Sequence, residues 1–409
     1  MANKRGARGG RGGSHIPTRA KGKTSNTSPT ETTPSEVDSP LTETAPSEAH
    51  TSVSTVPAKV TSKDFVESVL TPYGITLIQT QQVLSFNDHF SFPRDVPRNT
   101  AERLKYYKKK FPFSLFLTPS DETLETIRQE YEVMVNCRCP EAEFQDFALR
   151  DIIFCRVPLQ DPRTADISIR PVRALQRMAE RKRLQLLPRQ DQSGKQYNWD
   201  INPDCAYYIS LSAFPAIQRS QIRNRLPTVY DQAFCSYFTI EFKKDNQDLC
   251  TANNQIAIAS SLSLYNRWCL KRDALKVSNK HGNWPTEDKD QLRHYCITLA
   301  GADWKVWSLI PKTYENWSGC TMSALTCGEC RVTDSLALLF SILNDIHCWG
   351  LTVHAESCVA DVRATFEGGP SDRITRGPDE IRHFLDQARQ KEKSGQGNAV
   401  QKTDDQSKE

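Results

Sequence analysis

The chain has 409 residues, well above the ~150 residues typical of one domain, so we expect one large domain or two smaller ones. Only 38% of the residues are hydrophobic, which indicates that part of the chain stays outside any packed core. The 53 Lys and Arg against 49 Asp and Glu leave a net charge of +4, too small to indicate a nucleic-acid partner by itself.

Localisation signals and cysteines favour an intracellular protein. No run of about 18 apolar residues is present, so we expect no membrane span. The first residues lack the apolar stretch of a secretory signal, so the protein is not expected to be secreted. Thirteen cysteines without such a signal favour free thiols, and we expect a nuclear or cytoplasmic location.

The composition predicts two polar tails around one folded body. Residues 1–60 begin with a basic Arg/Gly arm and continue as an acidic, Ser/Thr/Pro-rich segment, and we expect both to be disordered. The arm is able to bind a nucleic-acid backbone through charge, or it is a solubilising or nuclear-import tail. The folded domain is expected over 61–369, and 370–409 is a second polar tail with one possible short helix, 378–391.

A helix and a strand are predicted in the first part of the folded body. A helix is expected to start with Thr118 as its N-cap and Pro119 at its first position, and Leu124, Ile127 and Tyr131 follow at helical spacing. Residues 151–157 are predicted to form a buried strand.

Residues 170–187 are predicted to form an amphipathic helix. At about 100° per residue, Arg170, Arg173, Arg177 and Arg181 fall within one quadrant, opposite an apolar side. The arginines are candidates for phosphate contacts, and the alternative is an ordinary solvated face.

Two predicted strands carry the candidate chemistry. One covers 205–214 directly after Asp204, and the other covers 234–243, with Glu241 and Lys243 on the face opposite Phe234, Phe238, Ile240 and Phe242. If the two strands pair, Asp204 approaches Glu241. Two such carboxylates supply hard oxygen ligands for Mg²⁺ or Mn²⁺, and a neighbouring lysine orients water or offsets developing charge.

The chain resembles the PD-(D/E)XK nucleases, and in particular an uncharacterised fungal family of PD-(D/E)XK nuclease-like domains. The stretches that carry the resemblance are Pro203-Asp204-Cys205-Ala206-Tyr207, Phe238-Thr239-Ile240-Glu241-Phe242-Lys243-Lys244, Asn254-Gln255-Ile256-Ala257 and Ile346-His347-Cys348-Trp349-Gly350-Leu351. The resemblance implies that Asp204 and Glu241 are metal ligands, that Lys243 is the catalytic lysine, and that Gln255 is aimed at the site. It covers about half of the chain well and the region before 203 only loosely.

The sequence departs from this family pattern in three ways. Ala259 stands where related nucleases often have a tyrosine. The long separation of Asp204 from Glu241 predicts an inserted loop over 215–232. An acid on the first helix often completes such sites, and both Glu141 and Glu143 are candidates.

Competing motifs are present. Two other acid-x-Lys triplets occur, Glu287-Asp288-Lys289 in a polar stretch and Asp303-Trp304-Lys305 at the start of a strand. Cys327 and Cys330 have zinc-ligand spacing and lie near further cysteines and histidines, but no second pair follows at matching spacing, so we expect inert buried thiols. A helix over 334–346 is expected to separate these thiols from His347.

Together these features predict an α/β, restriction-endonuclease-like domain. Its mixed sheet is flanked by helices, including one over 251–273, and a later hairpin turns around 301–303. The expected function is Mg²⁺-dependent hydrolysis of DNA, or of RNA. The alternatives are a catalytically inactive module on the same fold that binds nucleic acid or protein, and a zinc-stabilised interaction domain.

Overall fold

The structure is a computed structural model. It describes residues 64–79, 99–110, 117–153, 171–175, 184–191, 196–199, 202–244, 249–278 and 291–367, with isolated positions at 61, 96, 97, 284–286 and 289. The expected tails, 1–60 and 370–409, lie outside these residues. All the elements below belong to one unit, Thr55–Glu409.

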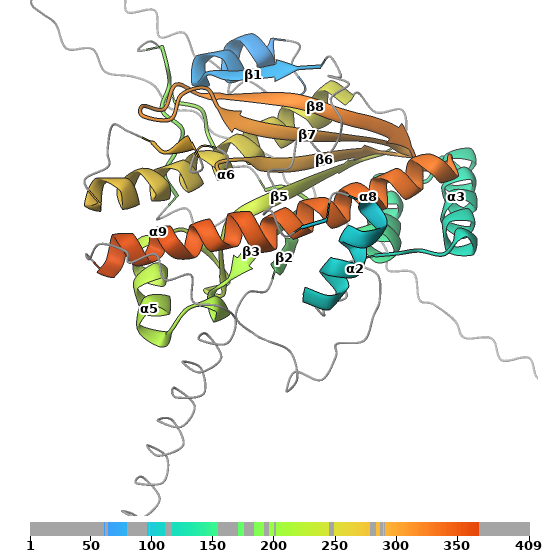
Figure 1. The fold of residues 1–409 in the computed structure, drawn as a ribbon. Helices are drawn as coiled ribbons and strands as arrows, with labels where there is room; N and C mark the ends of the chain where they lie inside the picture. Colours follow the sequence, from blue (N-terminus) through green and yellow to red (C-terminus); the bar gives the residue numbers. More distant parts are fainter. Residues whose placement is uncertain are drawn as a thin grey trace, which may run out of the picture. The chain divides into compact units, whose positions relative to one another are not determined.

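An eight-stranded mixed sheet forms the centre of the fold (Figure 1). Its strands are β1 (Ile75–Ile78), β2 (Pro171–Leu175), β3 (Cys205–Ser210), β4 (Thr228–Val229), β5 (Ala233–Lys243), β6 (His294–Ala300), β7 (Asp303–Pro311) and β8 (Cys320–Glu329). Seven of them follow the order β1-β8-β7-β6-β5-β3-β2, and β4 pairs with β5. The β1–β8 and β5–β6 pairs are parallel, and the other pairs are antiparallel.

Helices cover both faces of this sheet. The α-helices are α2 (Thr100–Lys110), α3 (Asp121–Asn136), α4 (Glu141–Phe147), α5 (Ala216–Arg225), α6 (Leu249–Val277), α8 (Thr333–Trp349) and α9 (Ala355–Glu367). Short 3-10 or π turns are η1 (Val66–Leu70), η2 (Thr71–Tyr73), η3 (Ala148–Ile153), η5 (Leu211–Ala213) and η6 (Gly350–His354). The predicted α/β class, a mixed sheet flanked by helices, is therefore confirmed.

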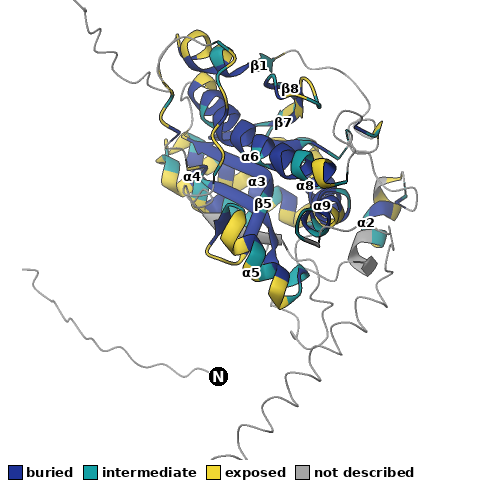
Figure 2. Cartoon of the chain, turned by 90° about the vertical axis from the view of Figure 1, so that its left-hand side faces the viewer, coloured by how far each residue is buried: buried dark blue, intermediate teal, exposed yellow. Residues whose placement is uncertain are grey.

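Two apolar clusters account for the burial of the sheet. One joins α3, α4 and α8 to β3, β5 and β6, and the other joins most of α6 to η1, β7 and β8. The small residues of α6, such as Ala257 and Ser260, allow its backbone to lie close to β5. Strand β5 is consequently buried on both sides, and Figure 2 shows it and α6 largely in dark blue.

Several predicted elements are confirmed with small shifts of their ends. Helix α6 contains the predicted 251–273, and α8 contains the predicted 334–346. Strands β6 and β7 form the expected hairpin, which turns at Gly301 and Ala302. The apolar positions Leu124, Ile127 and Tyr131 of α3 are buried, as their spacing indicated.

The predicted start of the first helix was wrong, and so was the strand predicted over 151–157 at its described residues, 151–153. Residues 154–157 lie outside the described residues. The N-cap of α3 is Ser120, whose hydroxyl accepts from the backbone N–H of Thr123, so the cap lies two residues after the expected cap at Thr118. Residues 148–153 continue α4 as the π-helical turn η3, which contradicts a strand starting at 151. Ile152 and Ile153 are buried there by a helical turn that packs into the core.

The predicted helix over 170–187 is also wrong where the structure describes it. Residues 171–175 form β2, which pairs antiparallel with β3, and Arg173 stands opposite Tyr207. An edge position beside β3 offers backbone hydrogen bonds that override the helical spacing of the arginines. The expected loop 215–232 is likewise wrong, since it contains α5 and β4.

A β-bulge interrupts the first half of β5. Cys235 has φ +48°, and the register against β3 shifts between Tyr207 and Ile209. The side chain of Tyr237 consequently reaches the α8 side, where its hydroxyl lies 2.9 Å from His347 Nδ1, while Thr239 bonds to Ser260 of α6. The simple alternation predicted for 234–243 therefore holds only after the bulge.

One continuous helical stretch, Thr333–Phe366, is long and apolar enough to cross a membrane by length and composition, which the sequence analysis did not expect. Its most apolar 18-residue window is 78% buried inside the protein. Most of this stretch packs against the central sheet, with α8 and α9 running across one face (Figure 1).

Candidate active site

The antiparallel pairing of β3 with β5 brings Asp204 to Glu241. Cys205 pairs with Ile240, so the residue before Cys205 stands beside the residue after Ile240. The backbone N–H of Phe242 donates to Asp204 Oδ2 at 2.7 Å and thereby extends the ladder by one side-chain bond. The approach of these two carboxylates, which the sequence analysis made conditional on strand pairing, is present.

Lys243 joins this pair from the same strand. Its ammonium donates to Glu241 Oε1 at 2.8 Å and to the carbonyl oxygen of Phe242 at 2.5 Å. Glu241 and Lys243 are only 3% and 6% exposed, so water screens their interaction poorly. Their i, i+2 spacing on one strand places both on one face.

A third carboxylate comes from α4, a helix that precedes β2 in the chain. Glu141, in the first turn of α4, lies 3.6 Å from Lys243 Nζ, measured at its Oε1. The sequence left Glu141 and Glu143 as equal candidates. The structure selects Glu141, because Glu143 instead interacts with Cys139.

Glu241 and Lys243 share a face with Thr239, and Thr239 contacts Ser260 of α6 at 2.7 Å. Glu241 lies two residues beyond Thr239, a rise of about 6.6 Å along the strand, and about four residues of helix cover the same rise. Since α6 returns antiparallel to β5, Gln255 lies level with Glu241. Gln255 Oε1 is buried and has no hydrogen-bond partner among the described residues.

Burial and mutual repulsion dominate the electrostatics of the carboxylates. Desolvation, reinforced by the charge of Asp204, raises the pKa of Glu241 from 4.5 to about 7, although Lys243 opposes the shift. Desolvation also raises the pKa of Asp204, against the Phe242 N–H bond and the charge of Lys243. Burial lowers the pKa of Lys243, but the attraction of Glu241 outweighs it and the net shift is upward.

The donors present fit a hard divalent cation. Among the described residues, no three His, Cys, Asp or Glu side chains gather closely enough to hold a metal ion by themselves. Asp204 and Glu241 nevertheless offer two carboxylates, and Mg²⁺ is usually held by one or two carboxylates together with water. Burial is the largest cause of the raised pKa values of Asp204 and Glu241, and a bound cation would favour both carboxylates in their ionised form. The oxygen of Gln255, which has no hydrogen-bond partner among the described residues, is a further neutral donor.

The arginines predicted to contact phosphates are not assembled into a stripe by the described part of the chain. Arg173 belongs to β2, whereas Arg170, Arg177 and Arg181 lie outside the described residues. The rival Lys305 lies two strands away from Glu241, since Thr298 of β6 pairs with both residues, and its side chain donates to Gln79 Oε1 at 2.8 Å. Glu287 and Asp288 of the other triplet lie outside the described residues.

The cysteines and histidines of the 320–358 region are distributed over different surroundings. Cys327 is exposed at the end of β8, whereas Cys330 is buried. Cys320 contacts Ser261, His347 contacts Tyr237, and His354 contacts Cys358. The predicted zinc-spaced pair is thus split between solvent and core.

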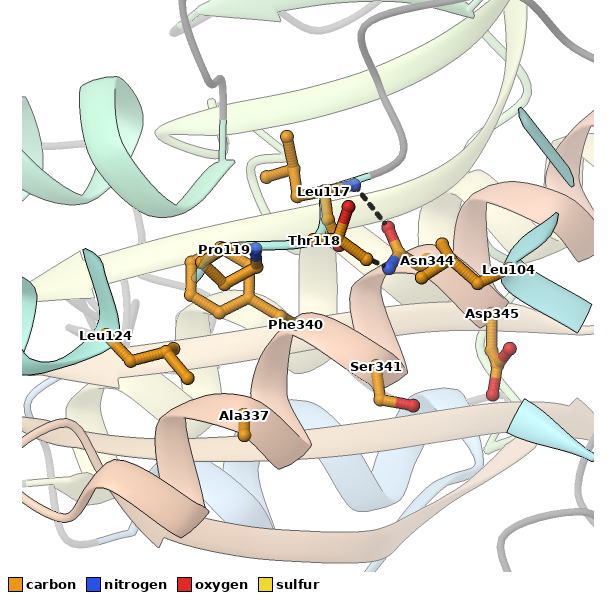
Figure 3. Close-up of a pocket in the computed structure, with 10 residues that line it drawn as sticks. All are labelled: Leu104, Leu117, Thr118, Pro119, Leu124, Ala337, Phe340, Ser341, Asn344 and Asp345. Atoms are coloured by element: carbon orange, nitrogen blue, oxygen red, sulfur yellow. Dashed lines mark hydrogen bonds between the residues drawn. The ribbon is translucent and has the colours of Figure 1, made fainter. Parts of the chain in front are cut away.

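A cavity of about 170 Å³ lies between the segment before α3 and helix α8 (Figure 3). Asn344 closes it by donating to the carbonyl of Leu117 and accepting from the same residue's N–H, both at 2.8 Å. Leu124 and Phe340 line it together with other residues of α8. None of the five residues described for the candidate site lines this cavity: Glu141, Asp204, Glu241, Lys243 and Gln255.

No family model, no curated protein and no solved structure matches this chain.

Proposed function

We propose that the protein is a metal-dependent nuclease with a PD-(D/E)XK-type core, acting on DNA or RNA. The observation that carries this proposal is the close group of the half-buried Asp204 and the buried Glu241 and Lys243, which two paired strands hold together. Buried carboxylates with raised pKa values are costly to retain for stability alone, and such groups are typical of functional sites.

The order of elements around the site supports the same proposal. An acid on a helix, Glu141, precedes three antiparallel strands, β2, β3 and β5. Helix α6 follows, and β6 then adds parallel to β5. The sequence predicted a helix before the motif strands and a helix after them, and α4 and α6 stand at these places, although β1, α2 and α3 precede α4 in the chain.

Each residue has a distinct proposed role. Asp204 and Glu241 would hold Mg²⁺ or Mn²⁺, and Gln255 would contribute its free oxygen. When bound, the ion polarises a phosphoryl oxygen and lowers the pKa of a water ligand. Lys243, fixed by Glu241, Glu141 and the Phe242 carbonyl, would orient the attacking water and offset charge on the phosphorane-like transition state.

A catalytically inactive binding module on the same fold is the second candidate. The 2.8 Å Lys243–Glu241 ion pair is the observation that favours it, because the two buried charges partner each other without any bound metal. Metal-dependent cleavage separates the two candidates.

The test is cleavage of single- and double-stranded DNA and RNA by the full chain with Mg²⁺ or Mn²⁺. We expect cleavage to be abolished in Asp204→Asn and Glu241→Gln, and to fall by about 10²–10³ in Lys243→Ala, as for loss of one transition-state donor. Lys305→Ala is the matched control for Lys243→Ala. A further variant, Glu141→Gln, removes the acid near Lys243, and Glu143→Gln is its matched control. Both controls should stay within a few-fold of wild type.

Folding of every variant is checked by circular dichroism. A folded wild-type protein that cuts none of these substrates with either ion would leave the binding module as the function. Cleavage that survives in Lys243→Ala but is lost in Lys305→Ala would move the site to the other triplet.

A further inference from the structure

Helix α5 has a basic, exposed surface. It contains three arginines and no acidic residue. The helix packs into the core through the buried Ile222, and much of the rest of it is exposed, as the yellow stretches of α5 in Figure 2 show. Arg223 and Arg225 are exposed, and Arg219 is half-buried. These three cations therefore lie where a partner in solution is able to reach them.

Two of the arginines are anchored by backbone oxygens. Arg219 Nε donates to the carbonyl oxygen of Phe214 at 2.8 Å, and Arg223 Nε donates to that of Asp231 at 2.8 Å. The Asp231 carboxylate itself accepts from Thr228 Oγ1 at 3.4 Å, and neither arginine forms an ion pair with a described residue. A carbonyl oxygen orients a guanidinium without neutralising it, so the outer N–H groups stay suited to the paired oxygens of a phosphate.

The third guanidinium also has a neutral partner. Arg225 lies over the ring of Phe366, 5.1 Å from its centroid, and it has no ion pair within the described part of the chain. An aromatic face attracts a cation but carries no net charge. Other arginines at the surface are paired with carboxylates: Arg128, Arg150, Arg189, Arg272 and Arg331. The arginines of α5 differ from these because their charge is not compensated.

An exposed aromatic ring lies next to these cations. Tyr230 and Asp231 are the central residues of the turn between β4 and β5, which the Gln232 N–H closes by donating to the Val229 carbonyl at 3.0 Å. Both central residues have φ +52°, a conformation that favours Asn or Gly and is rare for Tyr. Tyr230 is 51% exposed, and the bond from Arg223 to Asp231 joins this turn to α5.

We propose that α5 and the β4–β5 turn bind a single strand of nucleic acid. Backbone phosphates lie on Arg219, Arg223 and Arg225, and an unpaired base stacks on the ring of Tyr230. Cations beside an exposed aromatic ring fit a single strand, because its phosphates carry the charge and its unpaired bases offer a face for stacking. This inference rests on the proposed function and names the form of the substrate.

The proposed surface is remote from the carboxylates. The turn precedes Ala233 at the start of β5, and Glu241 lies about 26 Å further along the strand at about 3.3 Å per residue. The surface is therefore an anchor for the strand and takes no part in the chemistry. Its variants should leave the metal ligands unchanged, so binding of the strand and its cleavage are measured separately.

The experiment measures binding by the full chain with EDTA present, so that no cleavage occurs. Fluorescence anisotropy of labelled oligothymidine, oligouridine and a DNA duplex of the same length is followed over a series of salt concentrations. In Arg223→Gln/Arg225→Gln, the salt slope of log Kobs for the single strands should fall by about 1.4, since each lost phosphate contact removes about 0.7. Arg128→Gln/Arg150→Gln is the matched control, because it removes two arginines that already have carboxylate partners, and its slope should stay at the wild-type value.

The ring is tested separately from the charges. Tyr230→Ala should weaken the binding of both single strands about five-fold or more, with the salt slope unchanged, because stacking releases no counterions. Tyr230→Phe retains the ring and should bind as wild type does. Circular dichroism checks each fold, and if the double glutamine variant does not fold, the two Tyr230 variants decide.

Four outcomes overturn the inference. They are an unchanged salt slope in folded Arg223→Gln/Arg225→Gln, an unchanged single-strand affinity in Tyr230→Ala, and a wild-type protein that binds no strand. The fourth is displacement of the strand by polyglutamate as readily as by oligothymidine of equal charge, which would assign the surface to an acidic protein. All four are measured without metal, whereas the nuclease proposal is judged by cleavage with Mg²⁺ or Mn²⁺, so the two failures are distinguishable.

Discussion

Glu241 is central to the proposed chemistry of the site, and its burial also affects the stability of the folded protein. Burial at 3% exposure and the neighbouring carboxylate of Asp204 favour the protonated acid, while Lys243 favours the carboxylate. Because the pKa is raised to about 7 in the folded protein, the folded state holds a proton that the unfolded chain has lost between about pH 4.5 and 7. Stability therefore falls as the pH rises through this window.

This sign predicts the behaviour of Glu241→Gln without metal. The variant lacks the titration, so at pH 8 its free energy of unfolding should exceed that of wild type by about 1–3 kcal/mol. The gain should vanish by pH 4. Urea unfolding at both pH values, with EDTA present, measures it. A variant less stable than wild type at pH 8 would show that the pair with Lys243 outweighs the repulsion.

The sequence predicted Asp204, Glu241 and Lys243 as residues of the site, and it did not decide between Glu141 and Glu143 as the third acid. Asp204, Glu241 and Lys243 follow from two strand patterns and their pairing, which are local signals. Glu141 and Glu143 differ only in where α4 packs on the end of β5, and no local pattern encodes that packing. The family resemblance, rather than the spacing, implied that Gln255 is aimed at the site.

The start of α3 shows how an element boundary is chosen. Thr118 and Ser120 are both suitable N-cap residues, and Pro119 fits a first helical position after Thr118. The segment Leu117–Thr118 is instead held by Asn344 of α8 through both polar groups of Leu117 (Figure 3). This long-range contact moves the cap to Ser120.

We therefore predict that Ser120→Ala lowers the free energy of unfolding by about 1 kcal/mol, the usual cost of losing a side-chain cap. Thr118→Ala, at the position that the sequence favoured, should change it by less than about 0.5 kcal/mol. Guanidinium unfolding of the two variants beside wild type gives both values. The reverse order of effects would restore Thr118 as the cap.

The wrong helix over 170–187 has a different origin. Four arginines at helical spacing describe one face of a helix, but they say nothing of a neighbouring strand with free backbone groups. In the structure β3 provides that neighbour, and Pro171–Leu175 pair with it residue by residue. Strand formation depends on the partner more than on the segment itself.

At the scale of the whole molecule, one buried ion pair joins α2 to α8. Arg103 donates to both oxygens of Asp345, at 2.7 and 2.8 Å, and the two side chains are 2% and 3% exposed. Removing one partner leaves a buried charge without its counterion. Asp345→Asn should therefore lower the free energy of unfolding by about 3–5 kcal/mol.

The paired variant Arg103→Met/Asp345→Leu should recover most of that loss, because no buried charge remains. The exposed pair Arg128–Glu125 is the control, and Glu125→Gln should change stability little. Chemical unfolding of these three variants and of wild type measures the change in the free energy of unfolding for each. If the paired variant is as unstable as Asp345→Asn, an unpaired buried charge is not the cause of the loss, and the ion pair itself stabilises the fold.

The parallel pairing of β1 with β8 has a consequence for the order of folding. Gly74 and Gly319 both have positive φ, and the two backbone segments that contain them lie very close together. A Cβ atom on either glycine would overlap the other segment. Directly after these glycines, Ile75 pairs with Cys320. During synthesis β1 leaves the ribosome long before β8, its partner in the described part of the sheet, exists. The edge of the sheet that it forms is thus completed late, and this long sequence separation slows folding. Nascent chains that stop before β8 will keep an apolar strand unpaired, the kind of segment that chaperones bind.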